Sequence, residues 1–119
     1  MGRWLLCLCL CLLPLASPAA ELAPLADEGS LLLRAEQDRE LCRELAAGEV
    51  LHYRFDASAA LVFTAHFHRG EEGRSLWRRD EVRHEEGELT ATLAARYCLT
   101  WFNYQEDALT LRWQVSRHR

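Results

Sequence analysis

The sequence predicts an all-β protein, a compact antiparallel β-sandwich closed by one disulfide. From Gly48 onward, apolar and polar residues alternate with a period of two, which is typical of strands that cover a core with one face. Five or six such runs follow at regular spacing, separated by turn residues. The chain has 119 residues, enough for one domain and not two. A domain of this size buries only a modest core, so a cross-link would add to its stability.

The first twenty residues, MGRWLLCLCLCLLPLASPAA, have the features of a secretory signal peptide. Arg3 gives a positive start, and the apolar run 4–15 is too short to span a bilayer comfortably. Ser17 and Ala19 suit the small-residue rule for cleavage, which we expect after Ala19 or Ala20. The mature chain is then periplasmic or secreted and has no transmembrane segment. An uncleaved amino-terminal anchor is the alternative.

The charge of the chain argues against nucleic-acid binding. Eighteen acidic residues against fourteen basic ones give a formal net charge of −4, whereas nucleic-acid binding needs a basic face. Every basic residue is arginine, a bias that is typical of GC-rich genomes and favours a bacterial envelope.

Three of the five cysteines fall in the predicted signal peptide, so Cys42 and Cys98 remain as an even pair. In an oxidising compartment such a pair predicts a disulfide. The C-x-x-C spacing of a reactive dithiol is absent. Because the bridge closes a loop of more than fifty residues, it should stabilise the fold by roughly 3 to 4 kcal/mol.

The amino-terminal part of the mature chain is the most ambiguous. Residues 21–30 carry Pro24 and Gly29 and are expected to be a flexible segment. The sandwich domain is then expected to span residues 31–119. Residues 31–47 are rich in leucine, arginine and glutamate, which favour a helix. Two short strands, near 31–35 and 40–45, are the competing prediction because the apolar positions keep no clean helical stripe.

The remaining chain predicts strands at 50–55, 60–68, about 76–82, 88–93, 96–103 and 108–115. A turn at 56–58 should join the first two strands as a hairpin, and 69–74 should form a polar loop. The predicted inward residues are Leu51, Tyr53, Phe55, Leu61, Phe63, Ala65, Phe67, Leu89, Ala91, Leu93, Tyr97, Leu99, Trp101, Leu109, Leu111, Trp113 and Val115.

Two stretches resemble GOLD (Golgi-dynamics) domains. GEVLHYRF followed by ALVFTAHFH is similar to the G-x-x-L-x-W/Y-x-F segment and the apolar strand of that family. GELTATLAARYCLTWFN is similar to its G-x-F-x-A…Y-x-L-x-F-x-N segment. The resemblance covers roughly residues 40–115, and the matching positions are Gly87, Leu89, Ala91, Tyr97, Leu99, Trp101 and Asn103.

The resemblance implies a compact, jelly-roll-like β-sandwich that takes part in protein contacts and is not an enzyme. It also implies a disulfide between an early strand and the Tyr-to-Asn strand, which matches Cys42 and Cys98. Cys98 stands five residues before Asn103, where the cargo adaptors of the family have a spacing of three. Those adaptors continue into a coiled coil and a membrane anchor, whereas this sequence ends at Arg119, so coat binding is not carried over.

Three histidines are the candidates for a metal site. His66 and His68 lie two apart on the outward face of their predicted strand, and the expected hairpin would place His52 opposite His66. Three imidazoles close together could bind copper or zinc. Strand alternation alone explains the spacing, so we expect a solvated sheet face, no cofactor and no tight metal site.

No pattern of nucleophile, base or paired acids predicts an active site, and the chain is not expected to be an enzyme. Its predicted function is non-catalytic binding to a protein or envelope component. The candidate contact residues are Trp77, in a charged stretch that is either a docking loop or an edge strand, and Phe102 and Tyr104 at a strand end. The alternative is a small periplasmic metal binder that uses His52, His66 and His68.

Overall fold

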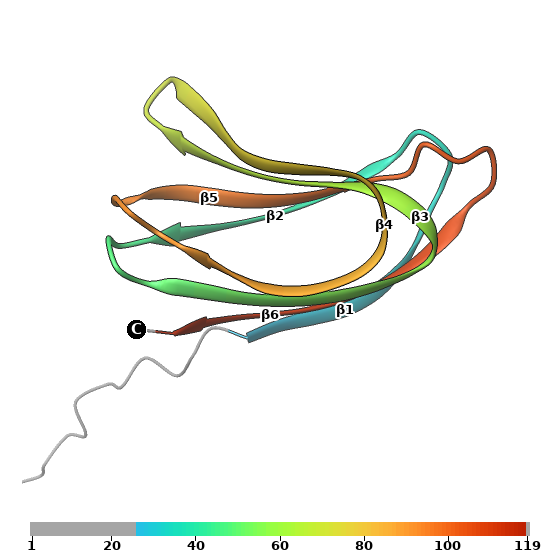
Figure 1. Cartoon of the computed structure of the whole chain (residues 1–119), viewed down its shortest axis with the longest axis horizontal. Coiled ribbons are helices and arrows are strands. Elements are labelled where there is room, and N and C mark those ends of the chain that lie inside the picture. Colours follow the sequence, from blue (N-terminus) through green and yellow to red (C-terminus); the bar gives the residue numbers. More distant parts are fainter. Residues whose placement is uncertain (1–25, 119) are drawn as a thin grey trace, which may run out of the picture.

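The computed structural model describes residues 26–118, which form six antiparallel strands arranged as a curled sandwich (Figure 1). The strands are β1 (Ala26–Leu33), β2 (Asp38–Leu45), β3 (Val50–Arg69), β4 (Glu72–Thr90), β5 (Ala95–Phe102) and β6 (Leu109–His118). The predicted all-β sandwich is confirmed. The predicted signal peptide lies outside the described residues, and so do residues 21–25. Within residues 26–118, no helix has the length and apolarity needed to cross a membrane.

Two long strands, β3 and β4, belong to both layers of the sandwich. The first part of β3 pairs with β6 and the last part pairs with β5, while β4 runs beside β3 along most of its length. One layer therefore has the order β1-β6-β3-β4 and is called the β6 sheet; the other has the order β2-β5-β3-β4 and is called the β5 sheet. Figure 1 shows β3 and β4 curving from one layer into the other.

The bend in β3 replaces a turn that the sequence predicts. Residues 56–58 were expected to join two strands of a hairpin, but β3 continues through them without a break. Its register against β4 shifts between Asp56 and Leu61, in a run of small residues, and such irregularities bend a strand and increase its twist. The segments 50–55 and 60–68 therefore lie in different layers and do not pair with each other. The predicted strand at 76–82 lies within β4, and the predicted strand at 88–93 overlaps β4 only at 88–90, because β4 ends at Thr90.

The ambiguous segment 31–47 forms strands and not a helix. β1 pairs with β6, and β2 pairs with β5, over eight residues each. This pairing outweighs the helix propensity of leucine, arginine and glutamate, which is a weak preference. Residues 26–30, expected to be flexible, are part of β1, because Ala26 already lies opposite Ser116 in the ladder. The described sandwich thus begins at residue 26 and not at 31.

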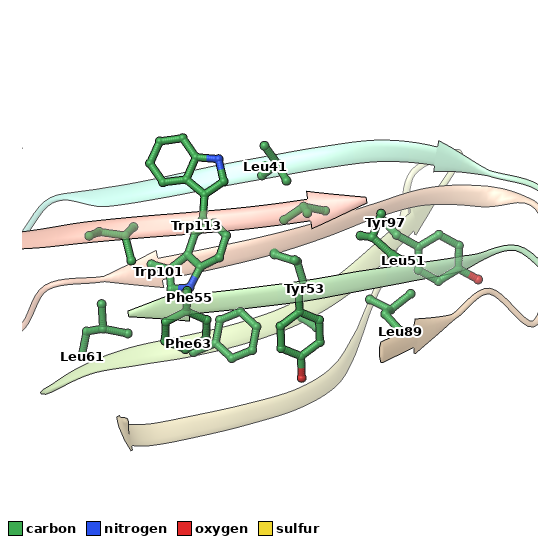
Figure 2. Close-up of a cluster of buried hydrophobic side chains, with 14 of the residues drawn as sticks. Leu41, Leu51, Tyr53, Phe55, Leu61, Phe63, Leu89, Tyr97, Trp101 and Trp113 are labelled. Atoms are coloured by element: carbon green, nitrogen blue, oxygen red, sulfur yellow. The ribbon is translucent and has the colours of Figure 1, made fainter. Parts of the chain in front are cut away.

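The core fills the space between the two layers, and Figure 2 shows its large side chains. Of the predicted inward residues, all but two are buried; Phe67 and Leu93 are partly buried at the edge of the cluster. Phe63 lies at its centre, with its ring centroid 4.7 Å from that of Phe55 and 5.6 Å from that of Trp101. The period-two pattern therefore predicted the inner faces of the sandwich correctly.

The predicted disulfide is present. Cys42 of β2 and Cys98 of β5 lie directly opposite each other and are bonded, with a separation of 56 residues in sequence. Both side chains face outward on the β5 sheet, and Cys98 is nevertheless almost fully buried. The bridge ties an edge strand to a central strand and closes residues 42–98 into one loop.

Candidate binding surfaces

Alternate residues of the β6 sheet face away from the core and carry charge. Arg112 of β6 pairs with Ser30 of β1 on one side and with Asp56 of β3 on the other. Two residues further along β6, Gln114 pairs with Glu28 and Arg54 in the same way. These side chains line a hollow of about 490 Å³, which an adjoining hollow of about 330 Å³ extends toward His52 and Glu86. We call this surface the charged groove and define it by Glu28, Arg54, Asp56, Arg112 and Gln114.

The arginines of the charged groove keep free hydrogen-bond donors. Among the residues that the structure describes, neither Arg54 nor Arg112 has a carboxylate oxygen within 4.0 Å. Gln114 donates from Nε2 to Glu28 Oε2 at 3.4 Å. Sequence reasoning missed this surface, because its members are single outward positions on separate strands and only the register brings them together.

The opposite face of the sandwich, on the β5 sheet, carries two of the candidate histidines. His66 lies beside Cys98 in the β3–β5 ladder, and Cys98 lies beside Cys42 in the next ladder. The ring centroids of His66 and His68 are 4.9 Å apart, and His66 Nε2 lies 3.5 Å from Glu40 Oε2. We call this surface the histidine–disulfide site and define it by Glu40, Cys42, His66, His68 and Cys98.

A hollow of about 600 Å³ lies over the histidine–disulfide site and is lined in part by Glu40, His68 and Cys98. Solvent and small solutes can therefore approach the ring of His68 and the neighbourhood of the bridge.

His52 does not join the other two histidines. It lies in the β6 sheet, where its ring centroid is 4.3 Å from that of His118 and its Nδ1 lies 3.3 Å from Glu88 Oε1. The predicted three-histidine cluster depended on a hairpin between 50–55 and 60–68. Because β3 bends into the other layer instead, the structure pairs His66 with His68 and places His52 with His118 on the other sheet.

The three candidate contact residues do not share one surface. Trp77 lies in β4 and not in a loop; it faces the core, 5.9 Å from Tyr53 and 6.3 Å from Phe63 between ring centroids, and is partly buried. Phe102 faces outward on the β5 sheet beside Val62. Tyr104 follows β5 and is 40% exposed. Trp77 is therefore separated from the other two by the sheet.

A polar contact closes the sandwich next to Trp77, at the β4 edge. Tyr53 donates its hydroxyl to Glu85 Oε2 at 2.5 Å, and Arg79 Nε lies 3.3 Å from the other oxygen of that carboxylate. Burial raises the pKa of Tyr53 well above its usual value, and the hydrogen bond to Glu85 raises it further. The hydroxyl therefore stays protonated and serves as a structural donor. Gly87 leaves room for it, since a Cβ there would lie 2.7 Å from the Tyr53 oxygen.

Comparisons with known proteins place the fold among small β-sandwiches of the jelly-roll type. A periplasmic inhibitor of g-type lysozyme from Aeromonas hydrophila, PliG, matches with a TM-score of 0.60 and 11% identity, over 78% of this chain and 86% of its own. The Yersinia pseudotuberculosis-derived mitogen matches with a TM-score of 0.61 and 10% identity, over 79% and 86% of the two chains.

A third solved structure, the TmCBM61 module in complex with β-1,4-galactotriose, has a TM-score of 0.55 and 11% identity over 76% of this chain and 68% of that one. No family model matches the sequence, and no curated protein matches it. At these identities the likenesses establish the fold.

Proposed function

We propose that this protein is a non-catalytic, extracytoplasmic binding domain whose charged groove contacts a protein or another component of the cell envelope. The observation that carries the proposal is the pair Arg54 and Arg112, two guanidinium groups in one 490 Å³ hollow without carboxylate partners among residues 26–118. Arginine presents a planar set of donors that fits carboxylates bidentately. A partner that offers carboxylates to this face fits the groove best.

The proposed location rests on the amino-terminal sequence and on the disulfide. A positive start, a short apolar run and small residues favour export and cleavage after Ala19 or Ala20. A disulfide persists in oxidising compartments. We also propose that the domain is a distant relative of GOLD domains, because its strand motifs resemble theirs and the domain is a small β-sandwich.

The non-catalytic assignment is supported by the placement of the polar groups. The core is apolar apart from Asn103, and Tyr53 uses its hydroxyl group in a structural hydrogen bond to Glu85. The groove combines charges of both signs, which suits recognition of a charged surface. Electrostatic complementarity of this kind steers association and selects partners.

Photo-cross-linking in the native envelope tests the proposal directly. A photoreactive amino acid replaces Gln114, in the charged groove, and in a matched variant replaces Arg74, an exposed residue at the start of β4. We expect a discrete adduct from position 114 and none from position 74. Adducts from position 74 alone, or from neither position, would contradict the groove as the binding surface.

The similar structures suggest the first defined partners to try. PliG inhibits g-type lysozyme, so the purified protein should be added to a g-type lysozyme assay and to a binding assay with that enzyme. The TmCBM61 module binds β-1,4-galactotriose, and the same sugar serves as the comparison. A charged groove favours the protein partner over the sugar, because neutral sugars lack the charges that Arg54 and Arg112 would pair with.

A further inference from the structure

We propose that the histidine–disulfide site becomes a Zn²⁺ site when the disulfide is reduced, with His66, His68, Cys42 and Cys98 as the four ligands. One ligand atom from each of His66, His68 and Cys98 lies within 4.8 Å of the others, and the same holds for Glu40, Cys42 and Cys98. Within residues 26–118, both of these clusters of three potential ligands contain Cys98. The two clusters therefore meet at the sulfur atoms of the bridge.

The site could hold one ion after side-chain rotation. Zinc binds thiolate sulfur at about 2.3 Å and imidazole nitrogen at about 2.0 Å in tetrahedral sites, which separates the ligand atoms by roughly 3.3 to 3.8 Å. Within each of the two groups the ligand atoms lie within 4.8 Å of one another. Once the bond is broken, rotation of the Cys42 and His68 side chains would bring the four ligand atoms of the proposed site together. Both side chains are at least partly exposed, so they have room to move.

The surroundings also favour a cation. Glu40 places a carboxylate oxygen 3.5 Å from His66 Nε2, and the hollow of about 600 Å³ gives an ion access past His68. A carboxylate next to a ligating histidine orients the ring and raises its basicity, and its loss weakens metal binding. Glu40 is thus assigned as a supporting residue.

The oxidised protein lacks the strong ligands. A disulfide sulfur carries no negative charge, so only His66, His68 and the carboxylate of Glu40 remain, and the site is weak. A dithiol reductant supplies two electrons and two protons, breaks the bond between Cys42 and Cys98, and is itself oxidised to a disulfide. Zn²⁺ then displaces the two thiol protons to solvent and binds two thiolates and two neutral imidazoles.

This proposal is independent of the charged groove, which lies on the other sheet. Zinc binding and partner binding can therefore succeed or fail separately. Reduction of the bridge alone would loosen β2 from β5. A bound metal ion would offset this loss, because it again links Cys42 to Cys98. Through the two histidines it would also link these strands to β3.

Cobalt titration of the untagged protein is the test, because Co²⁺ bound to thiolates in a tetrahedral site gives characteristic visible and near-ultraviolet absorption. With a phosphine reductant, we expect one Co²⁺ per chain, displaced by Zn²⁺. Without reductant, the thiolate absorption should be absent. A His66→Ala/His68→Ala variant should bind more than about 100-fold more weakly, and Glu40→Gln about tenfold more weakly.

The chain offers a matched control in its other histidine pair. A His52→Ala/His118→Ala variant removes two neighbouring imidazoles from the β6 sheet and should bind Co²⁺ like the wild type. A Cys42→Ser variant tests the site without reductant, since Cys98 is then a free thiol and should give absorption from one thiolate.

The proposal would be overturned by the absence of thiolate absorption in the reduced wild type, by unchanged affinity in the His66→Ala/His68→Ala variant, or by an equal loss of affinity in the control variant. Circular dichroism of the same samples guards against an unfolded chain. A folded signal that disappears on reduction and does not return with Zn²⁺ would also overturn it.

Discussion

Asn103 is a fully buried polar side chain that joins two loops at one end of the sandwich. Its Nδ2 donates to the carbonyl oxygens of Leu33 and Asp107, each at 3.0 Å, and its Oδ1 accepts from the Gln105 amide at 2.8 Å. Its own backbone pairs with Glu36 and Gln37 in the β1–β2 turn. The side chain therefore satisfies backbone groups that would otherwise be buried without partners.

An Asn103→Ala substitution should lower the free energy of unfolding by about 2 to 4 kcal/mol, because it leaves several buried groups unpaired. Urea denaturation measures the effect. Tyr104→Ala, at the exposed neighbouring position, should change stability by less than about 0.5 kcal/mol. Equal effects of the two substitutions would show that the hydrogen bonds of Asn103 contribute little.

Trp77 is partly buried and packs against the core at the edge of the sandwich, and its role in partner contact stays a prediction. Its ring packs against Tyr53 and Phe63, and Arg79 lies 5.7 Å from its centroid. Trp77→Ala should cost about 2 to 3 kcal/mol of stability, since it removes partly buried aromatic packing. Leu76→Ala, next to it but 40% exposed, is the control for thermal denaturation. A melting temperature for Trp77→Ala that equals the wild-type value would indicate that Trp77 does not contribute to core packing and acts as a surface residue.

At the scale of the elements, the disulfide holds the edge strand β2 to β5. β2 pairs only with β5 among the described strands, so the bridge protects the outermost ladder of the β5 sheet. The cross-link limits the conformations of the unfolded chain over 56 residues of separation. Because the loop between the cysteines is long, we expect the disulfide to stabilise the fold more than any other single interaction.

Replacing both cysteines by alanine should lower the free energy of unfolding by roughly 3 to 4 kcal/mol. The midpoint of guanidinium denaturation, compared in the wild type and in Cys42→Ala/Cys98→Ala without reductant or metal, measures it. A shift below about 1 kcal/mol would mean that the unfolded chain is constrained by other means.

The elements also show what the sequence could predict and what it could not. The alternation of residues in 50–55, 96–103 and 108–115 predicted strands and their inner faces, because one buried face per strand leaves a direct trace in the sequence. Residues 56–58 predicted a turn, yet the run of small residues that follows Asp56 allows a strand to bend. Only the pairing of β3 with β5 and β6 decides between the two.

The candidate sites were harder to predict than the fold, because they depend on which strands pair with one another. The placing of His52 beside His66 assumed a hairpin, and the bend in β3 puts them in different layers. The charged groove is built from β1, β3 and β6, which are distant in sequence, so single outward charges such as Arg54 carried no local signal. By contrast, the Cys42–Cys98 bond followed from cysteine count and compartment alone.

At the scale of the whole molecule, the sandwich presents two polar outer faces with different chemistry. The β6 sheet carries the charged groove, and the β5 sheet carries the histidines around the disulfide. The core between them is apolar and packed, and Figure 2 shows its aromatic rings gathered between the strands. The strands β3 and β4 run through both sheets, so the two faces are parts of one continuous structure.

Arg54 and Arg112 are proposed to bind the partner through its carboxylates. The most direct measurement is the dissociation constant of the cross-linked partner, determined for the wild type, for Arg54→Ala/Arg112→Ala and for Arg34→Ala. Arg34 is an exposed arginine in the β1–β2 turn, outside the groove. We predict that the double variant binds at least about tenfold more weakly, about 1.4 kcal/mol, while Arg34→Ala binds like the wild type. Wild-type affinity in a folded double variant would contradict the claim.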